Sequence, residues 1–168
     1  MSELANPTIN RNCRSVAVIL RSQAGTQPWS ERVWSLLAVL ADDQGSPARL
    51  HQADGDGVEI HICKGLHIRL DPHSCGAYYS NLLAQAPRAF VAAHMDADGC
   101  LRPHAVSLDI TEAEAWMERD DEVLSTPLMA ELLDWLEAYV MRHYRPEAPH
   151  KRRRKQWFDR GDMHGRGR

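Results

Sequence analysis

The stretch Val58-Glu-Ile-His-Ile-Cys-Lys-Gly-Leu-His-Ile-Arg-Leu70 decides the fold. Its apolar residues alternate with polar ones on both sides of Gly65, and a period of two residues is typical of a β-strand with one buried face. We expect the isoleucines and leucines to face the core, and His61, Cys63 and His67 to lie on a solvated face. Gly65 marks either a β-bulge or a second tight turn.

Turn residues on either side of this stretch predict hairpins. Asp54-Gly-Asp-Gly57 connects residues 49–53 to it, and Asp96-Ala-Asp-Gly99 connects strands expected at residues 88–95 and 101–108. The apolar run Val16 to Leu20 predicts a further buried strand. Because no long crossover joins neighbouring strands, we expect an α+β fold with a mainly antiparallel sheet, either open or curved into a half-barrel.

About three helices are expected to pack on one side of this sheet. Asp71-Pro72 has the pattern of an N-cap followed by proline at the first helical position. Thr111-Glu-Ala-Glu114 matches a capping box, which predicts a short helix that begins at Thr111 and carries Trp116.

The third helix is expected over Thr126 to Arg145, with Thr126 as its N-cap and Pro127 at its first position. Apolar residues recur there at steps of three and four, so one face should pack on the core through Leu132, Leu136 and Tyr139.

Residues 29–41 leave two alternatives open. Apolar residues stand at helical spacing, but they also alternate as in a strand, and periodicity alone does not decide so short a run. The helical set is Val33, Leu36, Leu37 and Leu40, and the alternating set is Trp34, Leu36, Ala38 and Leu40.

Composition and charge predict one domain with a basic tail. The chain has 168 residues and a net charge of −3, which suits a single core. Residues 146–168 hold 8 Lys and Arg against 3 acids, a net charge of +5, while the rest holds 12 against 20, a net charge of −8. We expect a flexible leader at residues 1–12, a domain at 13–145 and a flexible tail at 146–168.

The environment is expected to be cytoplasmic. Residues 1–12 lack the apolar core of a signal peptide, and no run reaches the 18 apolar residues of a membrane span. The spacing of Cys13, Cys63, Cys75 and Cys100 shows no pairing pattern, so reduced thiols are expected.

No motif in the chain predicts catalysis or a bound cofactor, and we expect neither. Phosphate-binding glycine motifs are absent from the sequence. His61, Cys63 and His67, with His73 and Cys75 after them, offer donors that zinc prefers, but their irregular spacing is not that of a structural zinc site. We therefore expect solvent-exposed histidines and no bound metal.

The basic run in the tail is the candidate partner-binding site. It is followed by two aromatic residues, and its residues are Lys151, Arg152, Arg153, Arg154, Lys155, Trp157 and Phe158. Arginine binds carboxylate and phosphate through paired hydrogen bonds, which favours an acidic or phosphate-bearing partner. Basic residues with aromatics also bind single-stranded nucleic acid, which is the alternative.

The order of several motifs resembles a proteobacterial domain-of-unknown-function family over residues 14 to 158. These motifs are Pro28-Trp29 with Trp34, the segment from Leu66 that ends Tyr78-Tyr-Ser-Asn-Leu82, and Lys151-Arg-Arg-Arg154 after an amphipathic helix. The resemblance implies that Trp29 to Leu40 is a strand.

Genes of that family lie beside those of formate dehydrogenase and its accessory factors. The resemblance therefore implies a non-enzymatic accessory or adaptor role in maturing or assembling a molybdenum-dependent formate dehydrogenase. It implies a protein partner, either a subunit of that enzyme or another accessory factor.

Overall fold

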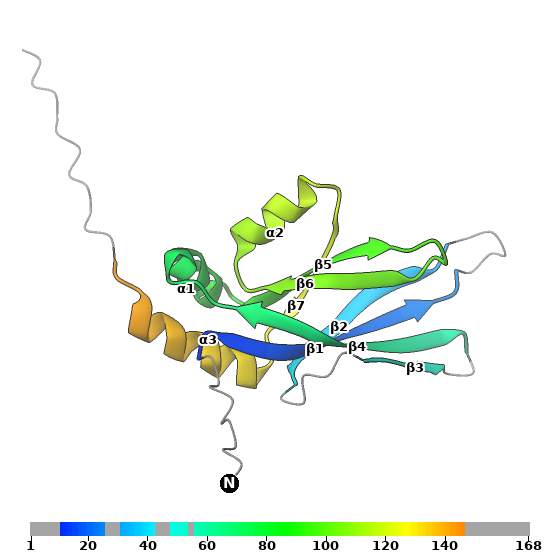
Figure 1. Ribbon diagram of the computed structural model, residues 1–168, viewed down its shortest axis with the longest axis horizontal. Helices are drawn as coiled ribbons and strands as arrows, with labels where there is room; N and C mark the ends of the chain where they lie inside the picture. Colours follow the sequence, from blue (N-terminus) through cyan, green and yellow to red (C-terminus); the bar gives the residue numbers. More distant parts are fainter. Residues whose placement is uncertain (1–10, 26–30, 43–47, 54–55, 147–168) are drawn as a thin grey trace, which may run out of the picture.

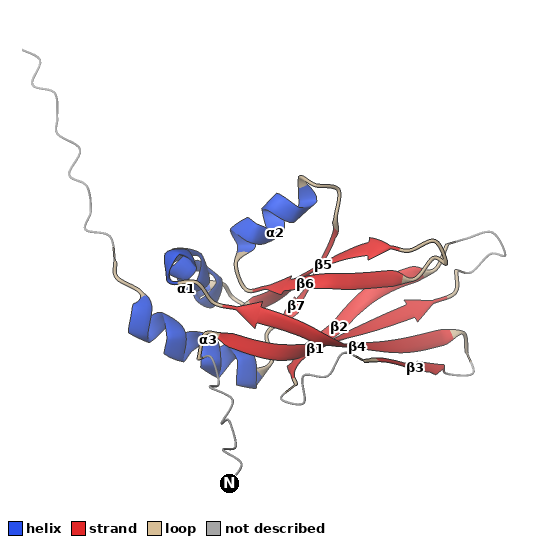
Figure 2. Cartoon of the chain, in the orientation of Figure 1, coloured by secondary structure: helices blue, strands red, loops and turns tan. Residues whose placement is uncertain are grey.

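The computed structural model describes residues 11–25, 31–42, 48–53 and 56–146. Within them the chain forms strands, three α-helices and one short 3-10 helix, η1 (Figure 2). In chain order the elements are β1 Cys13–Gln23, β2 Val33–Ala41, β3 Arg49–Ala53, β4 Val58–Arg69, η1 Pro72–Ser74, α1 Cys75–Leu83, β5 Arg88–Met95, β6 Leu101–Ser107, α2 Ile110–Met117, β7 Glu122–Pro127 and α3 Ala130–His143.

The described strands form two antiparallel sheets. The larger has the order β2-β1-β4-β3 and the smaller β6-β5-β7. All three helices gather toward the same end of the sheets, on the left in Figure 1. The α+β class and the antiparallel pairing are confirmed, and both predicted hairpins are present as β3–β4 and β5–β6. The division of the strands into two sheets was not predicted.

The main core lies between the two sheets and helices α1 and α3. Val16, Val18 and Leu20 of β1 are fully buried there. β5 alternates, so that Val91 faces this core while Phe90 faces a smaller cluster beneath Trp116 of α2. The other main-core side chains include Val39, Ile68, Tyr78, Ala89, Leu101, Leu132, Leu136 and Tyr139. The expected packing of the third helix through Leu132, Leu136 and Tyr139 is therefore confirmed.

The four cysteines differ in burial. Cys63 and Cys75 are buried, whereas Cys13 and Cys100 are partly exposed, and none of them forms a disulfide within the described residues. The reduced state of the thiols stays a prediction.

Strand β2 settles the two alternatives for residues 29–41. Val33–Ala41 pairs with β1 over its whole length, with Val39 opposite Val18. β2 is an edge strand, and its pairing with β1 supplies backbone hydrogen bonds along one of its two edges. The strand implied by the family resemblance is confirmed from Val33 onward, and residues 29–30 lie outside the described ranges.

A bulge at Gly65 changes which side chains of β4 face the core. Val16 pairs with Leu66 but Val18 pairs with Cys63, so Lys64 and Gly65 together oppose Ala17. Gly65 has a φ of 86°, a value that glycine adopts without strain. Of the two alternatives for Gly65, the bulge is the one formed.

Side-chain alternation therefore switches at the bulge. Beyond it, Ile68 and Leu70 are buried as predicted, but before it His61 and Cys63 are buried, and Ile60 and Ile62 are only partly so. The predicted solvated positions of His61 and Cys63 are wrong, because an added residue in a strand reverses the faces on one side of it.

The helix beginnings are partly as predicted. Asp71 caps η1, with His73 N donating to its carboxylate at 2.8 Å and Pro72 at the first position, as expected. The capping box at Thr111 is wrong. Asp109 is the N-cap of α2, and its carboxylate accepts from Thr111 N at 2.8 Å and from the Thr111 hydroxyl at 2.6 Å.

The predicted start of the third helix at Thr126 is also wrong. Residues Glu122–Pro127 pair with β5, and the Thr126 hydroxyl donates to Leu37 O of β2 at 3.1 Å. α3 begins at Ala130 after Met129 as N-cap. The sheet pairing outweighs the local cap signal, and proline is tolerated at the end of an edge strand.

Candidate functional site

The predicted basic run lies outside the described residues. Lys151, Arg152, Arg153, Arg154, Lys155, Trp157 and Phe158 all fall in the range 147–168. The described chain ends at Pro146, three residues after α3.

A pocket lined by arginines lies beside α3, close to where the described chain ends. The start of β1 and one face of α3 form it, and we call it the arginine pocket. Its lining residues are Arg11, Cys13, Arg14, Trp135, Ala138, Tyr139 and Arg142. Three cationic side chains around an indole ring suit a ligand that carries carboxylate or phosphate groups.

Contacts across the arginine pocket hold the start of β1 against α3. Arg14 Nη1 donates to Glu131 Oε1 at 2.7 Å, and the Arg14 guanidinium lies 5.6 Å from the centre of the Trp135 ring. Trp135 Nε1 donates to Arg11 O at 3.1 Å. These contacts join residues more than 100 positions apart, so the pocket exists only in the folded chain.

The predicted donor group of histidines and cysteines is not brought together. His61 and Cys63 are buried on β4, whereas His67 is exposed on the same strand beyond the bulge. His73 lies in η1 and Cys75 is buried at the start of α1. The structure instead places His61 in a different group.

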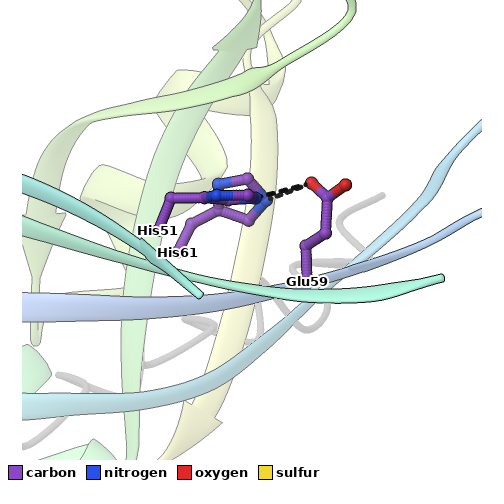
Figure 3. A group of neighbouring side chains, drawn as sticks. All are labelled: His51, Glu59 and His61. Carbon is purple, nitrogen blue, oxygen red and sulfur yellow. Dashed lines mark hydrogen bonds and ion pairs between the residues drawn. The ribbon is translucent and has the colours of Figure 1, made fainter. Parts of the chain in front are cut away.

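That group is the histidine–glutamate cluster, His51, Glu59 and His61, which β3 and β4 bring to one face of the larger sheet (Figure 3). His51 Nε2 lies 2.9 Å from Glu59 Oε2, and His61 Nε2 lies 3.4 Å from the same oxygen. The potential ligand atoms of the three residues all lie within 4.8 Å of one another.

Arg32 and Ser22 complete the polar surroundings of this cluster. Arg32 donates from both terminal nitrogens to the two Glu59 oxygens at 2.6 Å, a bidentate ion pair. Ser22 Oγ, which is fully buried, lies 3.1 Å from His61 Nε2. The hydrogen bond with His51, followed by the positive charge of Arg32, lowers the pKa of Glu59 below its usual value.

Comparison with protein-family models identifies the family of this chain. The family model described as "Protein of unknown function (DUF3305)" matches residues 15–155. The chain belongs to the DUF3305 family. Neither the search of curated proteins nor the search of solved structures gave a match.

Membership confirms the resemblance to a family of unknown function and agrees with its expected extent. The DUF3305 match covers the histidine–glutamate cluster, the basic run and the α3 side of the arginine pocket, but it begins after Arg11, Cys13 and Arg14. The family description names no activity, so the association with formate dehydrogenase stays a prediction. In the described part of this DUF3305 chain, no helix is long and apolar enough to cross a membrane.

Sequence reasoning missed the histidine–glutamate cluster because it depends on register. A two-residue turn centred on Gly55 and Asp56 would pair His51 with Ile60. The observed pairing, Ala53 with Glu59, is offset by one residue and sets His51 opposite His61. The glycine at position 57 is the local signal for the observed offset. Gly57 has a φ of 76°, and a left-handed residue at this position is typical of hairpin loops longer than two residues.

Proposed function

We propose that this chain is a non-enzymatic accessory protein that docks an anionic partner through the arginine pocket and the basic run Lys151–Lys155. We further propose that the partner is a subunit or accessory factor of a molybdenum-dependent formate dehydrogenase. The observation that carries the proposal is the gathering of Arg11, Arg14 and Arg142 around Trp135 at the end of the domain from which the basic tail continues.

Charge complementarity supports an acidic or phosphate-bearing partner. Exposed Arg142 lies in the last turn of α3, and Arg145 follows it. Lys151 is only five positions beyond Pro146, and five residues of chain span at most about 18 Å. The cations of the pocket and of the tail can therefore contact one partner surface. Tryptophan and arginine are also the residue types that most often dominate binding energies at protein interfaces.

The test measures formate oxidation and co-purification in the native host. We expect deletion of residues 147–168 to reduce both, and Arg142→Glu to weaken co-purification by disrupting the pocket's charge. Arg119→Glu is the matched control, because Arg119 is exposed beyond α2 and outside the pocket. Normal formate dehydrogenase activity and unchanged co-purification in both the deletion and the Arg142 variant would refute the proposal.

Nucleic-acid binding by the basic run and Trp157-Phe158 is the competing function. It predicts binding to generic oligonucleotides that weakens steeply with rising salt, because bound cations release counterions from the phosphate backbone. A protein that docks an acidic partner should show no such binding. Tight, salt-dependent oligonucleotide binding that is lost on deletion of residues 147–168 would favour the nucleic-acid function over the accessory role.

A further inference from the structure

We propose that His51, Glu59 and His61 form a binding site for one divalent transition-metal ion of the zinc class. Two imidazoles and one carboxylate are ligands that zinc accepts, and three protein ligands leave a position for water or a partner's side chain. This site lies on the larger sheet and is independent of the arginine pocket and the basic run.

The spacing of the donor atoms suits a tetrahedral ion. Metal–ligand bonds of about 2.0–2.1 Å place neighbouring ligand atoms about 3.3 Å apart. Glu59 Oε2 lies 2.9 Å from His51 Nε2 and 3.4 Å from His61 Nε2, and all three ligand atoms lie within 4.8 Å of one another, so rotation of the side chains brings the donors to one centre. Figure 3 shows the two imidazoles side by side, facing the carboxylate.

The sheet holds the ligands in place before any ion arrives. His51 and His61 are directly paired across β3 and β4, and Glu59 is two residues from His61, so all three point from the same face. Ser22 Oγ lies 3.1 Å from His61 Nε2, so its hydrogen bond must give way to the ion. The His61 ring is packed by Trp34, whose ring centre lies 4.8 Å away. A ligand held by packing in this way loses little conformational freedom on binding.

An ion can reach the site from the sheet edge. β3 is an edge strand, and the His51 side chain is 48% exposed, compared with 22% for Glu59 and 5% for His61. The site is therefore open to solvent at His51 and closed at His61, with Glu59 between them in exposure.

The Arg32 guanidinium would compete with a metal ion for the Glu59 carboxylate. Its guanidinium neutralises Glu59 through both carboxylate oxygens, and an incoming ion must displace it from at least one. Arg32 precedes β2 and also lines a second pocket with Glu31, Met95, Asp98 and Gly99. The carboxylates of Glu31 and Asp98 offer the displaced guanidinium an alternative partner.

Competition by Arg32 distinguishes a metal site from a structural ion-pair network. If the cluster binds a metal, removal of Arg32 strengthens binding, because the ion no longer competes for the carboxylate. If the cluster only pairs Arg32 with Glu59, its removal leaves an unpaired carboxylate and no metal affinity.

The experiment titrates the full-length, untagged protein with Zn²⁺ by calorimetry and with Co²⁺ by visible absorption. We expect one equivalent to bind, with a Co²⁺ spectrum of tetrahedral type and a rise in melting temperature, because an ion that binds only the folded state stabilises it. His51→Ala and Glu59→Gln should each weaken affinity at least 100-fold, and Arg32→Gln should strengthen it about 10-fold. His67→Ala is the control that leaves affinity unchanged, because His67 lies on β4 outside the cluster.

His51→Ala is the decisive variant, because exposed His51 can be replaced without disturbing the core. Absence of stoichiometric Zn²⁺ binding at micromolar concentrations would overturn the proposal. So would binding that survives both His51→Ala and Glu59→Gln in variants whose circular dichroism matches that of the wild type. A partner-docking defect in the Arg142 variant leaves this metal site unaffected, so the two proposals fail separately.

Discussion

The side chain of Asn81 provides the sharpest test of how helix α1 is joined to the smaller sheet. It lies in α1, is 7% exposed, and makes three hydrogen bonds to the backbone of neighbouring elements. Its Nδ2 donates to Arg88 O at 2.8 Å and to Leu108 O at 2.9 Å, and its Oδ1 accepts from Arg88 N at 2.9 Å. The side chain thus fixes α1 against the start of β5 and the end of β6.

Asn81→Ala removes all three bonds and leaves three backbone groups without their partner. At about 1 kcal/mol for each hydrogen bond, the unfolding free energy should fall by about 3 kcal/mol. That is a large share of the roughly 5–15 kcal/mol that stabilises an ordinary domain. Asn81→Asp should be at least as harmful, because it sets a carboxylate oxygen against two carbonyl oxygens.

Urea unfolding followed by circular dichroism measures the effect. Ser80→Ala is the matched control, since exposed Ser80 contacts only Gly76 O within its own helix at 3.0 Å, and it should change the unfolding free energy by less than about 0.5 kcal/mol. A loss below about 1 kcal/mol for Asn81→Ala, with an unchanged slope of the transition, would refute the reasoning.

Two further predictions concern Tyr139 and Asp96. Burial raises the pKa of Tyr139 to about 12, and its hydroxyl has no hydrogen-bond partner among the described residues. Tyr139→Phe removes this unpaired hydroxyl and should therefore raise the unfolding free energy by about 1 kcal/mol. A clear fall in the melting temperature of the variant would contradict this. The backbone amide of Cys100 and the side chain of Arg102 lower the pKa of Asp96. Its ionised form therefore stabilises the fold above the unfolded-state pKa, and this stabilisation is lost as pH falls through the lower folded-state value. Wild type should exceed Asp96→Asn in urea stability at pH 7 but not near pH 2, and a gap that does not change with pH would disprove the linkage.

Local patterns were sufficient to predict most elements of the fold. The hairpin turns and the Asp71 cap depend on neighbouring residues, and these predictions were confirmed. The predicted alternation was confirmed after Gly65 but was reversed before it. The errors at Thr126 and Thr111 have different causes. Thr126 pairs with β5, and a tertiary contact of this kind is not visible in a short window. At Thr111 the carboxylate of Asp109, only two residues earlier, caps the helix instead, so the sequence offered two local caps and the other one formed.

The candidate sites were less predictable, because both depend on residues distant in sequence. The arginine pocket joins Arg14 to Glu131, and the histidine–glutamate cluster needs the exact offset of the β3–β4 pairing. The histidines could be noticed in the sequence, but their burial could not. Only the choice between the bulge and the turn at Gly65 determines whether His61 faces inward.

Because of the bulge at Lys64-Gly65, the number of residues at this point of β4 determines which side chains of the strand face the core. A residue gained or lost in a surface loop changes only the loop. One residue lost at the bulge would exchange inside and outside for half of the strand, turning Ile60 and Ile62 inward and Glu59 and His61 away from Ser22 and Trp34. In family members that lack this residue, the positions of Ile60 and Ile62 should therefore face inward and carry apolar side chains, and the histidine–glutamate cluster should not form; chain length at this point separates the two groups in a sequence alignment.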